Sequence, residues 1–253
     1  MNIADKTFLL TGASGGIGGI LVKYLTASQA RVILVGRCGE SLRRAADISG
    51  GEVITADFTS ADDVAAVITK AQNIDGIINC AGAICFAEAV ATDAATINKI
   101  VAVNLAAPMI LTTGLLPMLL QRPEAIIVNI DSVFGFIGHP GYAAYCATKF
   151  GLRGFCEALS RELADTSVRV VYVAPRVVAT GSNSESAVAM NKALGNNCDS
   201  PEFVADVVMN VIRKDHSHAP IRMPERLFIK LKGNYVLASP FYFCHNIGKS
   251  NRA

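Results

Sequence analysis

The chain has 253 residues, of which 51% are hydrophobic and 17% are charged, and this balance excludes a disordered chain. The 23 lysines and arginines nearly match the 21 aspartates and glutamates, and no long basic run occurs, so nucleic acid is not an expected partner. The seven cysteines show no CxxC pair and no zinc-site spacing, which predicts free thiols in a reducing compartment and no metal site. The N-terminus lacks the pattern of a signal peptide, so we expect a cytoplasmic protein.

Short β-branched runs alternate with longer helical stretches along the chain. The predicted strands are Thr7–Thr11, Arg31–Gly36, Glu52–Ala56, Asp75–Asn79, Ala125–Asp131 and Val168–Val173. The predicted helices are Gly16–Ser28, Ser60–Ala71, Thr92–Leu120 with breaks, Tyr142–Leu163, and a further one that starts at Pro201 after Ser200. Most strands are apolar along their whole length, as in sheets covered on both faces. We therefore expect an α/β fold, a doubly wound parallel sheet of the Rossmann type, in a single domain over residues 1–253.

The stretch Ile100–Gln121 carries no charged residue and is long enough to span a bilayer. It also holds Asn104 and the prolines Pro108 and Pro117. We favour a helix that is buried against the sheet and a second subunit, because such a helix is apolar all round as well. The apolar helices Thr92–Leu120 and Tyr142–Leu163 predict a homodimer or a homotetramer.

A glycine-rich turn, TGASGGIG, connects the first predicted strand to the first predicted helix. Gly12, Gly16 and Gly18 permit a tight turn and let a pyrophosphate approach the backbone at the helix N-terminus. Gly12, Ser14 and Gly16 also match the G-x-S-x-G nucleophile elbow of hydrolases. That alternative is disfavoured, because an elbow on the first strand has no preceding strand and loop to supply the second oxyanion donor.

Tyr145 and Lys149 are four residues apart on a predicted helix, so their side chains share one face. A nearby ammonium group favours the phenolate and can lower the tyrosine pKa toward the range of efficient proton transfer. Ser132 follows a predicted strand, on the rim where open α/β sheets bind ligands, and its hydroxyl could contact a substrate carbonyl. Each signal is weak alone, and their combination predicts a proton-transfer site.

The chain resembles the short-chain dehydrogenase/reductase family from about Lys6 to Ile221. The ordered matches are TGASGGIG, Asp57 after the third strand, NCAG at Asn79–Gly82, Asn104 in VNLAAP, Ser132, YCATK at Tyr145–Lys149, and Pro175 with Thr180. The resemblance implies an enzyme that transfers a hydride between a nicotinamide cofactor and a small carbonyl or secondary alcohol substrate.

The resemblance also implies the role of each matching residue. Tyr145 would be the general acid or base, Ser132 would polarise the substrate oxygen, and Lys149 would bind the nicotinamide ribose and lower the Tyr145 pKa. Asn104 would hold a water that links Lys149 to a proton relay. The implied cofactor contacts are Gly12, Ser14, Gly16, Ile17 and Gly18 at the phosphates, Asp57 at the adenine, Asn79 and Gly82 near the adenine ribose, and Pro175 and Thr180 toward the nicotinamide.

Three residues depart from the family pattern. Cys80 stands where a second asparagine is usual, Asp131 stands where a serine commonly precedes the catalytic serine, and Arg176 replaces the glycine that follows Pro175. Arg176 could narrow the site or attract an acidic substrate. We favour solvent exposure or a loop contact, since most arginine side chains are exposed.

The end of the second predicted strand favours NADP(H) over NAD(H). NAD-preferring relatives have an acidic residue there that binds the ribose 2′-hydroxyl. This chain has Gly36 followed by Arg37, so no carboxylate repels a 2′-phosphate and an arginine can bind it. Ser14 could add a hydrogen bond.

Two later segments are predicted to serve the substrate or a surface. Residues 181–199 are polar and small, and the resemblance implies a segment that covers the substrate. The tail 224–253 mixes aromatic and basic residues. It would bind a membrane surface, cover a lipophilic pocket, or pack against the sheet or a neighbouring subunit, and we favour packing.

Two functions from different classes fit these patterns. The first is a carbonyl reductase or alcohol dehydrogenase, and the second is a cofactor-binding sensor or scaffold without turnover, since a fold alone does not select a function. Ser132, Tyr145, Lys149 and Asn104 favour the enzyme, because a protein that only binds the cofactor does not need this set.

Overall fold

The computed structural model describes residues 1–181, 185, 188–189, 191 and 198–214. The predicted tail 224–253 lies outside these residues, and so does most of the predicted covering segment 181–199.

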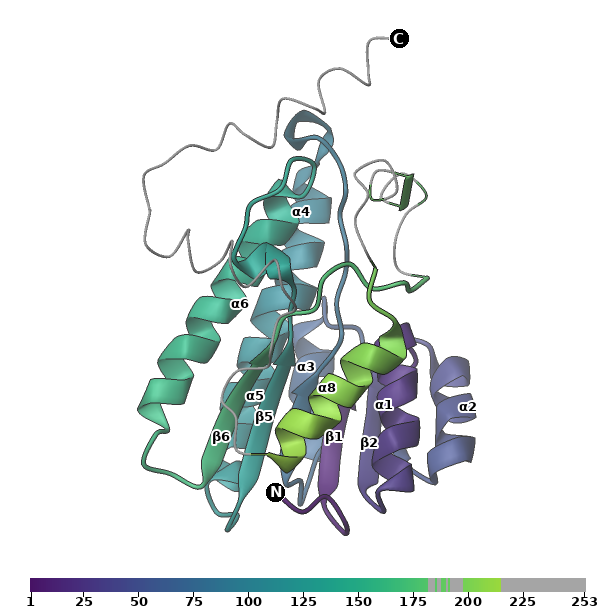
Figure 1. The fold of residues 1–253 in the computed structure, drawn as a ribbon, viewed down its shortest axis with the longest axis vertical. Coiled ribbons are helices and arrows are strands. Elements are labelled where there is room, and N and C mark those ends of the chain that lie inside the picture. Colours follow the sequence, from purple (N-terminus) through teal and green to yellow (C-terminus); the bar gives the residue numbers. More distant parts are fainter. Residues whose placement is uncertain (182–184, 186–187, 190, 192–197, 215–253) are drawn as a thin grey trace.

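Six parallel strands form one sheet with the order β3-β2-β1-β4-β5-β6 (Figure 1). The strands are β1 (Thr7–Thr11), β2 (Arg31–Gly36), β3 (Glu52–Thr55), β4 (Gly76–Asn79), β5 (Ala125–Ile130) and β6 (Val168–Val173). The chain winds outward from β1 to β3 and then returns to start β4 on the other side of β1. Strand order therefore reverses between β1 and β4, and open α/β sheets bind ligands at the carboxyl ends of the strands beside such a point.

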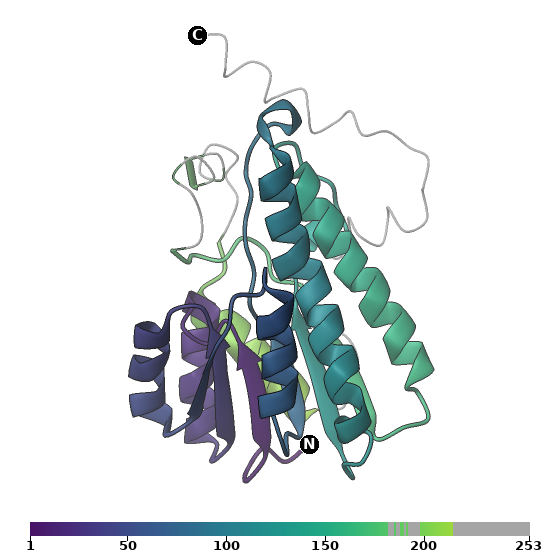
Figure 2. The same cartoon turned by 180° about the vertical axis from the view of Figure 1, so that it is seen from behind.

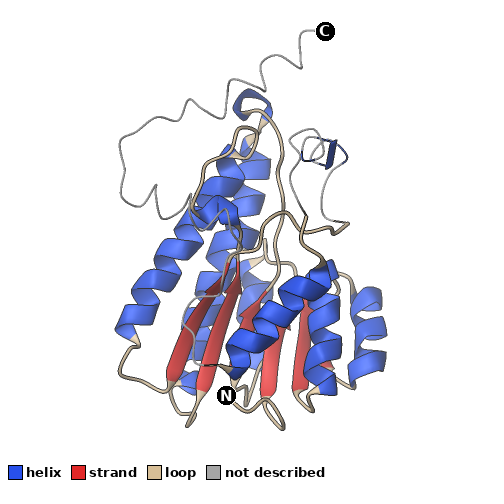
Figure 3. Cartoon of the chain, in the orientation of Figure 1, coloured by secondary structure: helices blue, strands red, loops and turns tan. Residues whose placement is uncertain are grey.

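Helices cover both faces of this sheet, so that the strands form a middle layer (Figure 3). One face carries α1 (Gly16–Ala27), α2 (Gly39–Ser49) and α8 (Pro201–Arg213), and α1 packs along α8. The other face carries α3 (Ala61–Lys70), α5 (Ala107–Leu119) and α6 (Ala143–Glu162), with α4 (Ala94–Val101) above α5 (Figure 2). This is the predicted doubly wound, Rossmann-type single domain.

The two covered faces explain why the strands are apolar throughout. Leu9 and Ile77 face the core beneath α3, α5 and α6, whereas their neighbours Leu10 and Ile78 face the core beneath α1 and α8. Every residue of β1, β4 and β5 is buried. A strand between two helix layers has no solvent face, so its side chains do not alternate in polarity.

The predicted helix starts are confirmed. The Ser60 hydroxyl accepts a hydrogen bond from the Asp63 amide (3.2 Å) at the start of α3. The Ser200 hydroxyl accepts one from the Phe203 amide (3.1 Å) at the start of α8, where Pro201 occupies the first helical position.

One helix was not predicted, and one predicted irregularity is now located. The helix α2 was not predicted, because its buried face has a single large apolar residue, Leu42, beside the small Ala45 and Ala46. The breaks predicted within Thr92–Leu120 are confirmed, since a π-helical turn, η2 (Ala102–Ala106), divides this stretch into α4 and α5. The strand ends Ala56, Asp75 and Asp131 also lie outside the observed strands.

Within the described part of the chain, the stretch Ala94–Leu119 is long and apolar enough to cross a membrane, with a mean hydropathy of 1.7. Leu111, Leu115 and Leu119 from this stretch pack into the core on the sheet. The apolar composition therefore matches the predicted helix buried against the sheet.

Candidate active site

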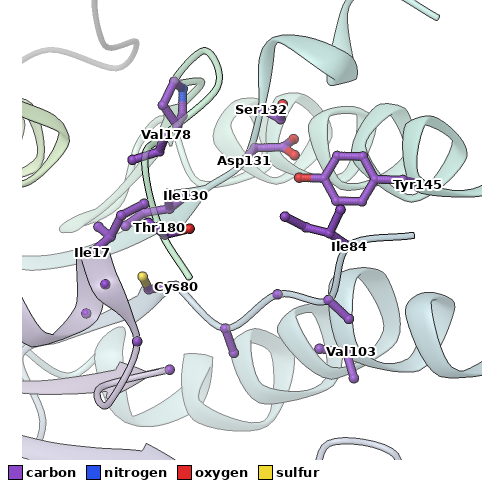
Figure 4. Close-up of a pocket in the computed structure, with 18 of the residues that line it drawn as sticks. Ile17, Cys80, Ile84, Val103, Ile130, Asp131, Ser132, Tyr145, Val178 and Thr180 are labelled. Carbon is purple, nitrogen blue, oxygen red and sulfur yellow. The ribbon is translucent and has the colours of Figure 1, made fainter. Parts of the chain in front are cut away.

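A cavity of about 800 Å³ opens at the carboxyl ends of the strands, where the strand order reverses (Figure 4). Most of the predicted site residues line it, from segments far apart in the sequence. These are Gly12, Ser14, Gly16, Ile17, Gly18, Arg37, Gly82, Ser132, Tyr145, Lys149, Pro175 and Thr180. Asp57, Asn79 and Asn104 do not line it.

The glycine-rich turn approaches the end of β4 so closely that side chains do not fit. Gly12 has φ = +69°, and a Cβ there would lie 2.9 Å from the Cα of Ala81. A Cβ at Gly18 would overlap the carbonyl oxygen of Gly12. The N-cap of α1 is Gly15, whose missing side chain cannot satisfy the first-turn amides. The turn is thus a backbone cradle at a helix N-terminus, which suits a phosphate group.

Tyr145, Lys149 and Ser132 meet at one wall of the cavity. Tyr145 and Lys149 are one turn apart on α6, and the Lys149 Nζ lies 5.5 Å from the centre of the Tyr145 ring. The Tyr145 hydroxyl points into the cavity toward the residues that follow β5 (Figure 4). Ser132 is one of these residues. Its Oγ accepts a hydrogen bond from the Phe134 amide (3.2 Å).

The pKa of Tyr145 is raised, not lowered as predicted. Burial is the main cause, and the charge of Asp131 adds to it. Lys149 acts in the expected direction, since its ammonium favours the phenolate, but it does not outweigh burial. Tyr145 therefore keeps its proton at neutral pH.

Asp131 forms an ion pair with Lys149 that the sequence analysis did not predict. The Lys149 Nζ lies 3.2 Å from Oδ1 of Asp131, and the two side chains are 5% and 0% exposed. Burial by itself would lower the pKa of Lys149, but the neighbouring Tyr145 and Asp131 raise it, so the ammonium form is retained. The sequence feature that could have indicated this ion pair is Asp131 itself, which stands where the family commonly has a serine.

Asn104 lies behind the cavity wall, in the π-helical turn between α4 and α5. Its Oδ1 accepts a hydrogen bond from the Ala83 amide (2.7 Å), and its Nδ2 donates to the Ala83 carbonyl (2.8 Å) and to Thr148 Oγ1 (3.3 Å). Asn104 thus ties the segment after β4 to α6, one residue before Lys149.

Asn79, one of the predicted cofactor contacts, turns its side chain into the protein instead of lining the cavity. Its Nδ2 donates to Asn129 Oδ1 (2.9 Å) and Thr112 Oγ1 (3.3 Å), and the residue is 3% exposed. It joins β4, β5 and α5 beneath the cavity.

Asp57 lies beside the cavity residue Phe58, and its Oδ1 accepts hydrogen bonds from the amide and hydroxyl of Thr59, which lower the pKa of Asp57.

The remaining two departures from the family pattern both line the cavity. The Cys80 sulfur lies at the end of β4, and burial raises the pKa of its thiol to about 12 (Figure 4). Arg176 pairs with Asp199, with 2.8 Å between Nη2 and Oδ1, and its side chain is only 13% exposed. The predicted loop contact is confirmed, whereas the alternative of solvent exposure is wrong.

Arg37 follows Gly36 at the end of β2, and it is exposed at the cavity rim. A Cβ at Gly36 would lie 3.6 Å from Ser14 Oγ, so the glycine-rich turn and the end of β2 are neighbours. A phosphate bound between them would meet both a hydroxyl and a guanidinium group.

Comparisons with known proteins identify the family. The model of the short chain dehydrogenase family matches residues 6–191. The 3-oxoacyl-[acyl-carrier-protein] reductase of Rickettsia felis is 33% identical over 182 residues, which cover 69% of this chain and 73% of the relative. A metagenomic short-chain oxidoreductase, solved in complex with NADP, is 30% identical with a TM-score of 0.73, and the match covers 88% of this chain and 99% of that one.

A short chain dehydrogenase/reductase from Burkholderia phymatum, solved in complex with NAD, shares the fold with a TM-score of 0.83 at 20% identity, over 93% of this chain and 95% of that one. The matched family model, the ordered motifs and the cavity agree. The chain belongs to the short-chain dehydrogenase/reductase family of oxidoreductases.

Proposed function

We propose that the protein is an NADP(H)-dependent oxidoreductase that interconverts a carbonyl group and a secondary alcohol. The observation that carries this proposal is the convergence of Tyr145, Ser132 and Lys149 on the cavity that also contains the glycine-rich turn. The proposed compartment is the cytoplasm, consistent with the free thiols of the described cysteines.

The cavity fits a dinucleotide. Side chains at Gly12 and Gly18 would fill the cradle, and the α1 amides face a phosphate there. We assign Arg37 and Ser14 to the 2′-phosphate, Lys149 to the nicotinamide ribose, and Pro175 and Thr180 to the nicotinamide end. The bound cofactor supplies the hydride, while the protein orients the reactants and provides the proton.

The protein's own contribution is hydrogen bonding and proton transfer at the substrate oxygen. In reduction, the Tyr145 hydroxyl donates its proton to the carbonyl oxygen as negative charge develops there, and the Ser132 hydroxyl donates a hydrogen bond to the same atom. The raised pKa of Tyr145 suits this acid role at neutral pH. Asn104 holds α6 in position through Thr148.

The substrate class that we would test first is 3-oxoacyl thioesters, because the Rickettsia felis relative is named for that activity. The cavity is lined by apolar side chains, with Ile84 and Phe134 beside Tyr145 and with Val103 and Val178 farther along the wall, which suits a substrate with hydrocarbon on both sides of the carbonyl.

The test is NADPH oxidation with a panel of ketones, aldehydes and 3-oxoacyl thioesters. Tyr145→Phe should lower kcat by about 100-fold or more, because general acid catalysis contributes that much. Tyr24→Phe, in α1 outside the cavity, is the matched control and should retain activity. NADPH binding without turnover on any substrate, unaffected by Tyr145→Phe, would support the sensor or scaffold alternative instead.

A further inference from the structure

The carboxyl end of β5 presents two adjacent polar residues to the cavity, and only Ser132 has a role so far. Asp131 is the other, and Figure 4 shows its carboxylate facing the Tyr145 hydroxyl. Its side chain is fully buried; Oδ1 pairs with the Lys149 ammonium group at 3.2 Å, and the Tyr172 hydroxyl and the Ser132 amide also lie against the carboxylate. A buried carboxylate is costly unless it is paired, so its presence at this position needs a reason.

The groups around Asp131 come from four parts of the fold. They are Tyr145, Lys149 and Cys156 from α6, Cys80 from the end of β4, Tyr172 from β6, and the Ser132 amide. The thiols are neutral throughout the working range, since burial raises the pKa values of both Cys80 and Cys156 to about 12. The pKa of Tyr172 is raised as well, mainly by burial, so its phenol is neutral. Lys149 is thus the cation of this group.

Two arginines of the surrounding segments, Arg153 and Arg176, have partners of their own. Arg153 stacks on Phe136, 4.1 Å from the ring centre, and its Nε contacts Glu157 at 3.0 Å. Arg176 pairs with Asp199. The carboxylate of Asp131 and the ammonium group of Lys149 therefore offset each other directly beside Tyr145.

We propose that Asp131 is a positioning residue of the active site, whose carboxylate holds the Lys149 ammonium group and offsets its charge beside the Tyr145 phenol. This inference rests on the proposed function and adds a residue specific to this chain. Without Asp131, the unopposed charge of Lys149 would favour the phenolate. With Asp131, Tyr145 stays protonated to higher pH, so the site favours carbonyl reduction over alcohol oxidation at neutral pH.

Asp131→Asn tests the proposal, because it removes the charge and keeps the shape. Tyr145 can be titrated without substrate or cofactor, as the tyrosinate absorbance that disappears in a Tyr145→Phe background. We expect tyrosinate to form at a pH about 1 unit or more lower in Asp131→Asn than in the wild type. In enzyme assays, the ascending limb of alcohol oxidation should move to lower pH by a similar amount.

Asp75→Asn is the matched control. Asp75 is also a buried carboxylate paired with a lysine, 3.4 Å from Lys6 Nζ, but it precedes β4 at the opposite edge of the sheet. This variant should lose stability and leave the Tyr145 titration unchanged. Asp131→Ser, the residue usual in the family, is the second variant if Asp131→Asn does not fold.

The outcomes separate this inference from the proposed function. If the wild type turns over no substrate but the tyrosinate titration shifts in Asp131→Asn, the charge relation stands and the reductase assignment fails. A folded Asp131→Asn or Asp131→Ser protein that titrates like the wild type overturns the inference, even if activity falls, because Asp131 would then be merely structural. The same holds if Asp75→Asn shifts the titration equally.

Discussion

Arg37 is the residue on which the proposed cofactor preference depends. It lies at the cavity rim after Gly36, with no acidic residue at the end of β2. A charge-assisted hydrogen bond to a 2′-phosphate is worth about 1.5–3 kcal/mol, so Arg37→Asp should lower kcat/KM for NADPH by about 10- to 100-fold and erase or reverse the preference.

Arg44→Asp makes the same charge change on the exposed side of α2, where Arg44 pairs with Glu40, and should leave the ratio of NADPH to NADH unchanged. Steady-state kinetics with both cofactors measure the effect. Equal kcat/KM values for NADH and NADPH in the wild type would sink the assignment of Arg37 to a 2′-phosphate.

Two adjacent glycines of α1 allow a second comparison. A Cβ at Gly18 would overlap the Gly12 carbonyl oxygen, whereas a Cβ at Gly19 meets its nearest atom at 4.0 Å. Gly18→Ala should distort the turn, lower the melting temperature and weaken NADPH binding by tenfold or more. Gly19→Ala should stabilise the helix by about 0.5–1 kcal/mol, because alanine loses less backbone entropy than glycine.

Urea unfolding and NADPH titration of both variants check this. If Gly18→Ala bound NADPH as tightly as Gly19→Ala does, the turn would not be the phosphate cradle that its geometry indicates.

At the residue scale, spacing and the family resemblance predicted most of the side chains that line the cavity, but not which partners they have there. Tyr145 and Lys149 are adjacent on any helix, so their pairing could be predicted. The contact between Lys149 and Asp131 joins a helix to a strand end and depends on how α6 lies on the sheet. The raised pKa of Tyr145 follows from burial, which the sequence does not state.

At the scale of elements, the segment after β6 contains Arg176, which departs from the family pattern and pairs with Asp199. The residues Pro175–Val178, Thr180 and Gly181 line the cavity, and Val178 pairs with Asp199 in an isolated β-bridge. The Asp199 amide donates to the Val177 carbonyl (2.7 Å), and the Ala179 amide donates to the Asp199 carbonyl (3.1 Å). These backbone hydrogen bonds join the cavity wall to the start of α8, and the Arg176–Asp199 ion pair strengthens the same connection.

Arg176→Gly should destabilise the protein by about 3–5 kcal/mol, because it leaves the 4% exposed carboxylate of Asp199 without its ion-pair partner. Asp199→Asn in the same chain should restore part of that loss, since no buried charge then remains. Urea unfolding of the wild type, both single variants and the double variant measures the coupling. Strictly additive effects would mean that the pair is not coupled.

Element types were more predictable from the sequence than element breaks. The strands β1, β2 and β6 were predicted to the residue, because β-branched runs between turns have few other interpretations. The π-helical turn at Asn104 was not, since it forms where that side chain bonds both backbone groups of Ala83. The helix α2 was missed because the small residues Ala45 and Ala46 form most of its buried face beside Leu42.

On the scale of the whole molecule, the candidate active site lies at one edge of the sheet, and exposed apolar side chains lie on the helices of one layer. The cavity occupies the carboxyl edge of the sheet. Ile97 and Val101 of α4, Ile110 of α5 and Phe150 of α6 are 40%, 38%, 49% and 43% exposed. Apolar side chains gathered on adjacent helices are typical of a subunit interface.

The predicted homodimer or homotetramer would bury this layer. Light scattering after size-exclusion chromatography should show an assembly larger than a monomer at micromolar concentration, and Val101→Glu combined with Phe150→Glu should dissociate it, because two buried carboxylates per subunit would face an apolar partner surface. Ile48→Glu changes an equally apolar, 59% exposed residue on α2 and should leave the assembly intact. A monomeric wild type, or dissociation by Ile48→Glu as well, would show that these helices do not form the interface.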